Sequence, residues 1–68
     1  MNLSKRIKKS RTKNGLTQLD LSEKSGISLR TIQRIENEEV TPSIYSLNKI
    51  SETLNEDFSF SENKSKFK

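Results

Sequence analysis

Apolar residues recur at helical spacing in successive stretches of this 68-residue chain, and short polar segments separate the stretches. In the first stretch Leu3 and Ile7 lie four residues apart, and Arg11 continues the same stripe with its long aliphatic stem. Asn14 and Gly15 follow, and glycine is the usual residue just past a helix C-terminus. We therefore expect a first helix that begins near Leu3 and ends at Asn14.

The second stretch opens with the residues of a helix N-terminus. Thr17 is a favourable N-cap, and Asp20 follows three residues later, as in a capping box with a shorter acid. Leu16 and Leu21 have the spacing of a hydrophobic staple across that cap. A second helix is expected over residues 18–25.

Gly26 separates this helix from the next one. Glycine permits the positive φ that a tight turn between two helices requires. Ile27 is expected to enter the core, and Ser28 is expected to cap a third helix from Leu29 to Asn37.

Helical periodicity assigns faces to these two helices. In the second helix it predicts burial of Leu21 and Ser22 and exposure of Leu19. In the third helix it predicts that Ile32 and Ile35 point inward, whereas Leu29, Arg30, Gln33 and Arg34 point outward.

A fourth helix is expected after a loop over residues 38–41. Thr41 is the expected cap, and Pro42 would occupy the first helical position, where its missing N–H costs nothing. The apolar stripe of this helix consists of Ile44, Leu47, Ile50 and Leu54. Asn55 is expected just past its end.

These elements predict an all-α fold in which one small domain occupies residues 1–60. The polar, basic residues 61–68 are expected to form a disordered tail. The chain has no cysteine and no histidine, so we expect no disulfide, metal or cofactor. No apolar run is as long as a membrane span, and the charged N-terminus does not resemble a signal peptide, so a cytoplasmic location is expected.

Positive charge is concentrated at the N-terminus. Residues 1–14 contain six basic residues and no acid, whereas the whole chain has a net charge of +4. Such a basic end beside a nearly neutral body favours an anionic partner. The alternative is an ordinary solvated helix face.

The composition argues against an enzyme. Without histidine or cysteine the remaining nucleophile scheme pairs serine with lysine, and no paired carboxylates share an inward helical face. The S-x-x-K spacing occurs at Ser10/Lys13, Ser46/Lys49 and Ser61/Lys64. In a chain with eleven serines and nine lysines such matches arise by chance.

Two helices joined by a glycine turn, with arginine and glutamine on the second, match the helix-turn-helix of DNA readers. The segment GLTQLDLSEKSGISLRTIQRIEN, followed by TPSIYSLNKISETLN, resembles the phage repressor and Cro-like (XRE family) domain over about residues 3–55. The resemblance implies a four- to five-helix bundle of the lambda-repressor-like type, with the helix-turn-helix formed by helices 2 and 3. It also implies a transcriptional regulator of double-stranded DNA, most often a repressor.

The resemblance also implies roles for individual residues. The positions that match base-contacting residues of the family are Ser28, Leu29, Arg30 and Arg34, and Gln33 is a further candidate because it lies on the same outward face. The candidates for phosphate contact are Thr17, Gln18, Thr31 and Asn37. Arg11 and Glu36 match a partly buried ion pair between helix 1 and helix 3.

The chemistry of these residue types agrees with the base-contact roles. A guanidinium can donate two parallel hydrogen bonds to guanine O6 and N7, and Leu29 could contact a thymine methyl group. Gln18 stands where helix N-terminal amides favour an anion, although it could equally serve as a capping residue. The alternative for Arg30 and Arg34 is a simple surface role, with Arg34 paired to Glu38.

Several positions depart from the family pattern. Glu38 and Glu39 occupy a loop that usually contains glycine and a basic residue, so repulsion from phosphates is expected there. Polar residues also replace common apolar residues or alanines at Ser10, Ser22, Ser51 and Thr53. The chain has no alanine at all, so we expect a thin core and modest stability.

DNA readers of this type commonly bind as two-fold dimers, and Phe58 and Phe60 stand where the family often places its dimer contact. The alternative is that one phenylalanine closes the core of its own chain.

The rival function is a protein-binding module that uses Leu19, Leu29, Phe58 and Phe60, as in antitoxin members that resemble this family.

Overall fold

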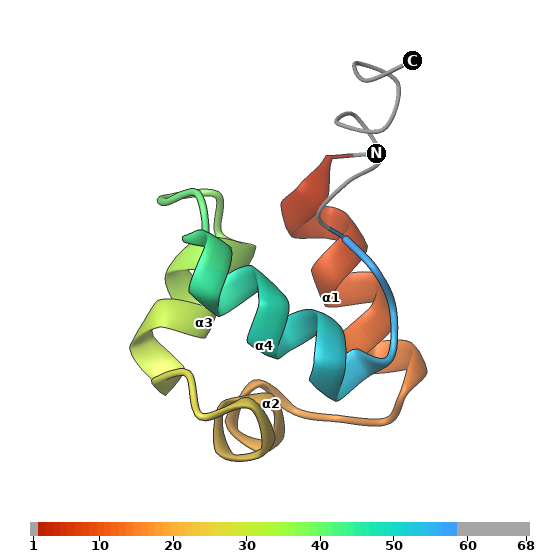
Figure 1. Ribbon diagram of the computed structural model, residues 1–68. Helices are drawn as coiled ribbons and strands as arrows, with labels where there is room; N and C mark the ends of the chain where they lie inside the picture. The colour runs from red at the N-terminus through yellow and green to blue at the C-terminus, as the bar shows by residue number, and fades with distance from the viewer. Residues whose placement is uncertain (1, 59–68) are drawn as a thin grey trace.

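The computed structural model describes residues 2–58, which form four helices and no strand. They are α1 (Leu3–Lys13), α2 (Gln18–Ser25), α3 (Leu29–Glu36) and α4 (Ile44–Leu54). Helix α2 packs against both α3 and α4, and α3 also contacts α1 (Figure 1). The expected all-α fold is therefore confirmed. None of the helices in the described part of the chain is both long and apolar enough to cross a membrane.

Short-range capping fixes where the first helices begin and end. Thr17 and Asp20 form the expected capping box, in which each side chain accepts a hydrogen bond from the other residue's backbone N–H. Gly26 has a φ of 78°, in the left-handed region that favours glycine. Ser28 then caps α3 by accepting from the N–H of Thr31. The turn between α2 and α3 therefore forms as the sequence predicts.

The core lies between the four helices and is almost entirely aliphatic. It consists of Ile7, Leu21, Ile27, Ile32, Ile35, Ile50, Leu54 and Phe58. Helix α2 contributes Leu21 and Ser25, whereas the predicted burial of Ser22 is wrong because Ser22 is only half-buried. Ser25 is tolerated in the core because its hydroxyl accepts a hydrogen bond from the N–H of Ile27.

Helix α3 ends in a Schellman motif with glutamate at the position where glycine is usual. The N–H of Glu38 donates to the carbonyl of Ile35 at 3.1 Å, and the N–H of Glu39 donates to the carbonyl of Arg34 at 2.8 Å. Glu38 has a φ of 64°, which is strained for a residue with a side chain. Asn37 is the C-cap, so the helix ends one residue earlier than expected.

Helix α4 begins later than the sequence suggests. Ser43, not Thr41, is the N-cap, and its hydroxyl accepts a hydrogen bond from the N–H of Ser46. Pro42 therefore precedes the helix instead of occupying its first position. Ile44 is 79% exposed, so its predicted place in the apolar stripe is wrong, although Ile50 and Leu54 are buried as expected.

The segment after α4 runs back beside α1 (Figure 1). Asn55 ends α4 in the left-handed conformation, and Phe58 enters the core with 3% of its surface exposed. The Arg6 guanidinium lies 5.2 Å from the Phe58 ring centroid and 3.6 Å from the carboxylate of Glu56. Phe58 thus closes the core of its own chain, which is the alternative to a dimer contact. Phe60 and the predicted tail over residues 61–68 lie outside the described residues.

Candidate nucleic-acid interface

The outward face of α3 presents exposed polar side chains to solvent. Arg30, Gln33 and Arg34 are exposed, whereas the opposite face of the helix buries Ile32 and Ile35. Leu29 is half-buried, so it is less accessible than expected. The helix therefore offers two guanidinium groups and one amide from a single rigid element.

The first turn of α3 uses its hydroxyl groups internally. The Ser28 hydroxyl accepts from the N–H of Thr31 at 3.2 Å and donates to the Thr31 hydroxyl at 2.9 Å. Ser28 is exposed and Thr31 is half-buried. A nucleic acid at this end of α3 would meet a hydroxyl pair that is already oriented by the helix cap.

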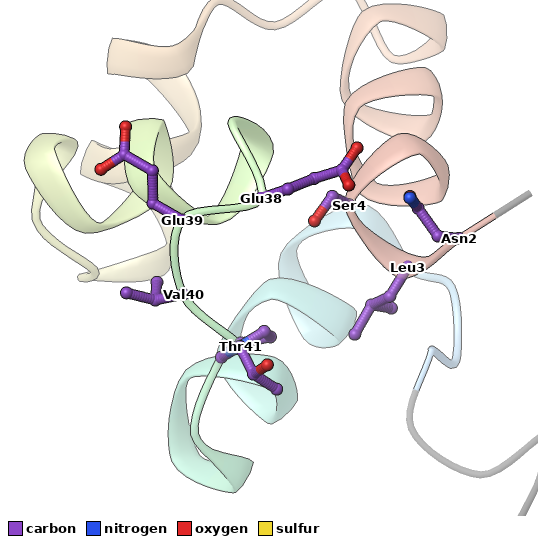
Figure 2. A pocket seen from close by; sticks show the side chains of 8 residues that line it. Asn2, Leu3, Ser4, Glu38, Glu39, Val40 and Thr41 are labelled. Carbon is purple, nitrogen blue, oxygen red and sulfur yellow. The ribbon is translucent and has the colours of Figure 1, made fainter.

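Arg34 makes an ion pair on the surface, but with a different partner from the one suggested by spacing. Its Nε lies 3.5 Å from Oε1 of Glu39, and the two side chains are 47% and 54% exposed. The Schellman motif explains the partner, because it fixes the backbone of Glu39 against that of Arg34. The Glu38 side chain extends instead toward Ser4 at the start of α1 (Figure 2).

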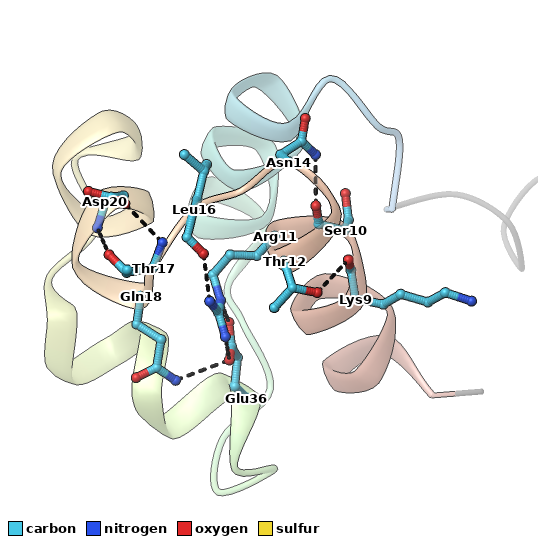
Figure 3. A network of polar contacts seen from close by, with 10 residues as sticks. All are labelled: Lys9, Ser10, Arg11, Thr12, Asn14, Leu16, Thr17, Gln18, Asp20 and Glu36. Atoms are coloured by element: carbon cyan, nitrogen blue, oxygen red, sulfur yellow. Dashed lines mark hydrogen bonds and ion pairs between the residues drawn. The ribbon is translucent and has the colours of Figure 1, made fainter.

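A buried polar network ties α1, α2 and α3 together beneath this surface (Figure 3). Glu36 accepts from Nε and Nη2 of Arg11 at 2.7 and 3.0 Å, and from Nε2 of Gln18 at 3.0 Å. The remaining terminal nitrogen of Arg11, Nη1, donates to the carbonyl of Leu16 at 2.7 Å. No buried side-chain nitrogen or oxygen among residues 2–58 lacks a partner. The ion pair implied for Arg11 and Glu36 is thus present, and Arg11 is structural.

The bond from Gln18 to Glu36 places the start of α2 beside the last turn of α3. Gln18 keeps its amide oxygen for another partner, and the first backbone N–H groups of α2 have no acceptor within the helix. Asp20, however, adds a negative charge at this helix N-terminus. Hydrogen bonds from the backbone and hydroxyl of Thr17, with the nearby charge of Lys24, hold the pKa of Asp20 below its ordinary value of 3.8.

The basic residues of α1 do not all have the same role. Lys5, Lys8, Lys9 and Lys13 are exposed. Arg6 is paired with Glu56, and Arg11 is buried with Glu36. The N-terminal concentration of charge therefore leaves four lysines for solvent or an anionic partner, and two arginines that hold the fold together.

Sequence reasoning missed an apolar surface at the start of α4. Ile44 is 79% exposed and Tyr45 is 65% exposed, and they are adjacent on the first turn. The ammonium of Lys49 lies 5.7 Å from the Tyr45 ring centroid. With Thr41 as the expected N-cap, Ile44 was assigned to the buried stripe. Ser43 is an equally good N-cap, and it would have placed Ile44 and Tyr45 in the first turn of the helix.

An open groove of about 330 Å³ lies between the start of α1 and the loop after α3 (Figure 2). Its lining includes Asn2, Ser4, Glu38, Glu39 and Thr41. Glu38 and Glu39 make the groove acidic. Two carboxylates make this part of the surface unfavourable for a phosphate backbone.

Two of the three serine–lysine pairs lie among the described residues. Ser10, a residue of α1, is buried, and the Ser46 hydroxyl accepts a hydrogen bond from the Ser43 hydroxyl. The Lys49 ammonium is held over Tyr45. The third pair, Ser61 and Lys64, lies outside the described residues.

Comparison with known proteins identifies a family. A family model described as "Helix-turn-helix" matches residues 7–60, which is most of the chain. No curated protein and no solved structure matches. The matched range includes α2, the Gly26 turn and α3 in full.

Proposed function

The chain belongs to the XRE family of helix-turn-helix domains, which are DNA-binding transcription regulators, and we propose that it represses transcription by reading a specific sequence in double-stranded DNA. In this proposal α3 lies in the major groove. Arg30, Gln33 and Arg34 contact base edges, and Ser28 and Leu29 approach the bases at the start of the helix.

The outward face of α3 is the observation that carries this proposal. An ordinary solvated face mixes acids with lysines, whereas this one offers two arginines and a glutamine with no acid on the face itself. Arginine can bind guanine through two parallel hydrogen bonds, and glutamine can bind adenine in the same way. Helix α3 is fixed from behind by buried Ile32 and Ile35, so these groups are presented on a rigid support.

Phosphate contacts complete the proposed interface. Gln18 lies beside the last turn of α3 and can donate to a phosphate from its backbone N–H. Thr17, Thr31 and Asn37 are the further candidates. Exposed lysines of α1 add attraction that does not depend on sequence and weakens with salt.

A second copy of the chain is proposed to join on DNA through the start of α4. Phe58 is buried in the core of its own chain. Ile44 and Tyr45 are large apolar side chains that are exposed, and they follow the loop that leaves α3. An aromatic side chain buries about 150–250 Å², far less than the roughly 800 Å² per partner of a stable interface. The dimer is therefore expected on a two-fold operator and not in free solution.

The rival function, a protein-binding module such as an antitoxin, has weaker support. Of the four residues that suggested it, Phe58 is buried and Leu29 is half-buried. Phe60 lies outside the described residues. Leu19 alone is well exposed, at 50%. A single leucine is a normal surface feature and does not define a partner site.

Selection from a random pool of duplex DNA, followed by gel shift, tests the proposed function. We expect one sequence to be enriched and its complex to persist at moderate salt, because base contacts add to phosphate contacts. Loss of all binding at moderate salt with no enriched sequence would rule out specific recognition.

A further inference from the structure

Glu39 contacts Arg34 through one particular nitrogen. The 3.5 Å contact joins Oε1 of Glu39 to Nε of Arg34. A guanidinium has five N–H donors in one plane, of which Nε carries only one. The contact therefore leaves the terminal nitrogens Nη1 and Nη2 for a second partner, and these two can donate in parallel to O6 and N7 of guanine.

The position of Glu39 is set by the end of α3 and not by its side chain. Its N–H donates to the carbonyl of Arg34 at 2.8 Å, and the left-handed conformation of Glu38 turns the chain so that this bond can form. The backbone of Glu39 is therefore fixed beside that of Arg34 by the end of the helix itself. Arg30, the other arginine of the outward face, has no ion pair within residues 2–58.

We propose that Glu39 is a positioning residue that sets the base specificity of Arg34. It holds the guanidinium by Nε so that Nη1 and Nη2 meet one guanine, and its negative charge weakens binding to the phosphates of any sequence. The proposal rests on the proposed function, since it requires α3 to lie in the major groove.

Two physical effects act in the same direction. Ordering a long side chain on binding is costly, and a side chain already held by a neighbour loses less freedom when it meets the base. A carboxylate near the DNA backbone also reduces the electrostatic attraction on which non-specific binding depends. Glu39 thus supports the correct complex through Arg34 and penalises every complex through charge, which raises the ratio of specific to non-specific binding.

A simpler role would give the opposite result at the best site. If Glu39 only competed with DNA for Arg34, the pair would have to break in the specific complex. Removing Glu39 would then strengthen the best site at least as much as random DNA. The contact through Nε argues against this, because it leaves free the two nitrogens that the guanine needs.

Glu39→Gln tests the proposal, with Glu38→Gln as the matched control. Both variants remove one negative charge from the same loop, but the Glu38 side chain extends toward Ser4 and not toward Arg34 (Figure 2). We expect both variants to bind random DNA about twofold to fivefold more tightly. Only Glu39→Gln should reduce the preference for the guanine read by Arg34, by about threefold to tenfold, as expected when one long side chain is no longer held in place.

A double variant separates the two effects of Glu39. In an Arg34→Ala background, Glu39→Gln should tighten binding to all sequences equally and change no base preference. Each variant is first checked for an unchanged circular dichroism spectrum and melting temperature. Equal base preferences in Glu39→Gln and Glu38→Gln, or a best site strengthened as much as random DNA, would overturn the positioning role alone. A wild-type protein with no preferred sequence would overturn the proposed function as well.

Discussion

The carboxylate of Glu36 accepts two hydrogen bonds from the guanidinium of Arg11, from Nε at 2.7 Å and from Nη2 at 3.0 Å. Only 9% of the Arg11 side chain and 2% of the Glu36 side chain are exposed. This pair joins α1 to α3, and Gln18 adds α2 through the same carboxylate. The orientation of the outward face of α3 therefore depends on a buried polar contact as well as on aliphatic packing.

Removing one partner of this pair should be strongly destabilising. Glu36→Leu leaves the Arg11 charge buried without a counterion, which costs about 3–5 kcal/mol. The free energy of unfolding of so small a domain is not much larger, so we expect the variant to be only marginally stable at 25 °C. Urea unfolding followed by circular dichroism measures the effect.

The double variant Arg11→Met/Glu36→Leu provides the control. It removes both charges, so it should be more stable than Glu36→Leu alone. Glu39→Gln breaks only an exposed pair and should change the stability by less than about 1 kcal/mol. A Glu36→Leu protein that unfolds at the same urea concentration as wild type would contradict the structural role of the pair.

The strain at Glu38 predicts a stabilising substitution. A left-handed backbone costs about 1–2 kcal/mol for a residue with a Cβ, whereas glycine adopts it freely. Glycine also gives the unfolded chain more conformational freedom, which lowers the stability of the fold by about 0.4–1 kcal/mol. Glu38→Gly should therefore stabilise the fold by roughly 0.5–1 kcal/mol. Glu39→Gly removes the same charge without a positive φ, so in urea unfolding it should be neutral or destabilising. A similar gain from both would show that charge, not backbone strain, is responsible.

Features determined by residues close in sequence could be predicted before the structure. Thr17, Gly26 and Ser28 act through caps and a turn that involve neighbours three or four residues away. The aliphatic residues of α3 followed from periodicity alone. The same is true of Leu21, which fills the core as expected.

Features determined by contacts between distant segments could not be predicted in the same way. Phe58 had two possible places, and only the packing of the last segment against α1 decides between them. The partner of Arg34 depends on the backbone conformation of Glu38, which gives Glu39 the position next to Arg34. The start of α4 was misplaced because Thr41 and Ser43 are both good caps, and Pro42 fits either choice.

Asp20 should show a lowered pKa. Its carboxylate accepts from the N–H of Thr17 in the folded protein, which favours the charged form. A lowered folded pKa gives stability that is present above the unfolded value and is lost as the pH falls through the folded value. Asp20→Asn should therefore be less stable than wild type at neutral pH, and the difference should shrink in acid. NMR titration of the carboxyl carbon should give a midpoint below 3.8; a midpoint at or above it would contradict the capping box.

The exposed start of α4 predicts cooperative binding to two half-sites. Tyr45→Ser should abolish cooperativity on an operator with half-sites about one helical turn apart and leave binding to a single half-site unchanged. Quantitative gel shift measures both. Leu19→Ser, which removes another exposed apolar side chain, is the control and should keep cooperativity. Independent binding by the wild-type protein, or unchanged cooperativity in Tyr45→Ser, would exclude this contact.

Base reading by α3 is tested most directly with Arg34→Ala, in which affinities are measured for the selected site, for each base substitution within it and for random DNA. The expected result is a loss of about 1–3 kcal/mol at the selected site and relaxed preference at one base pair. Lys8→Ala, an exposed residue of α1, should instead weaken all sequences alike and flatten the salt dependence. If Arg34→Ala weakens selected and random DNA equally, α3 does not read the sequence through Arg34.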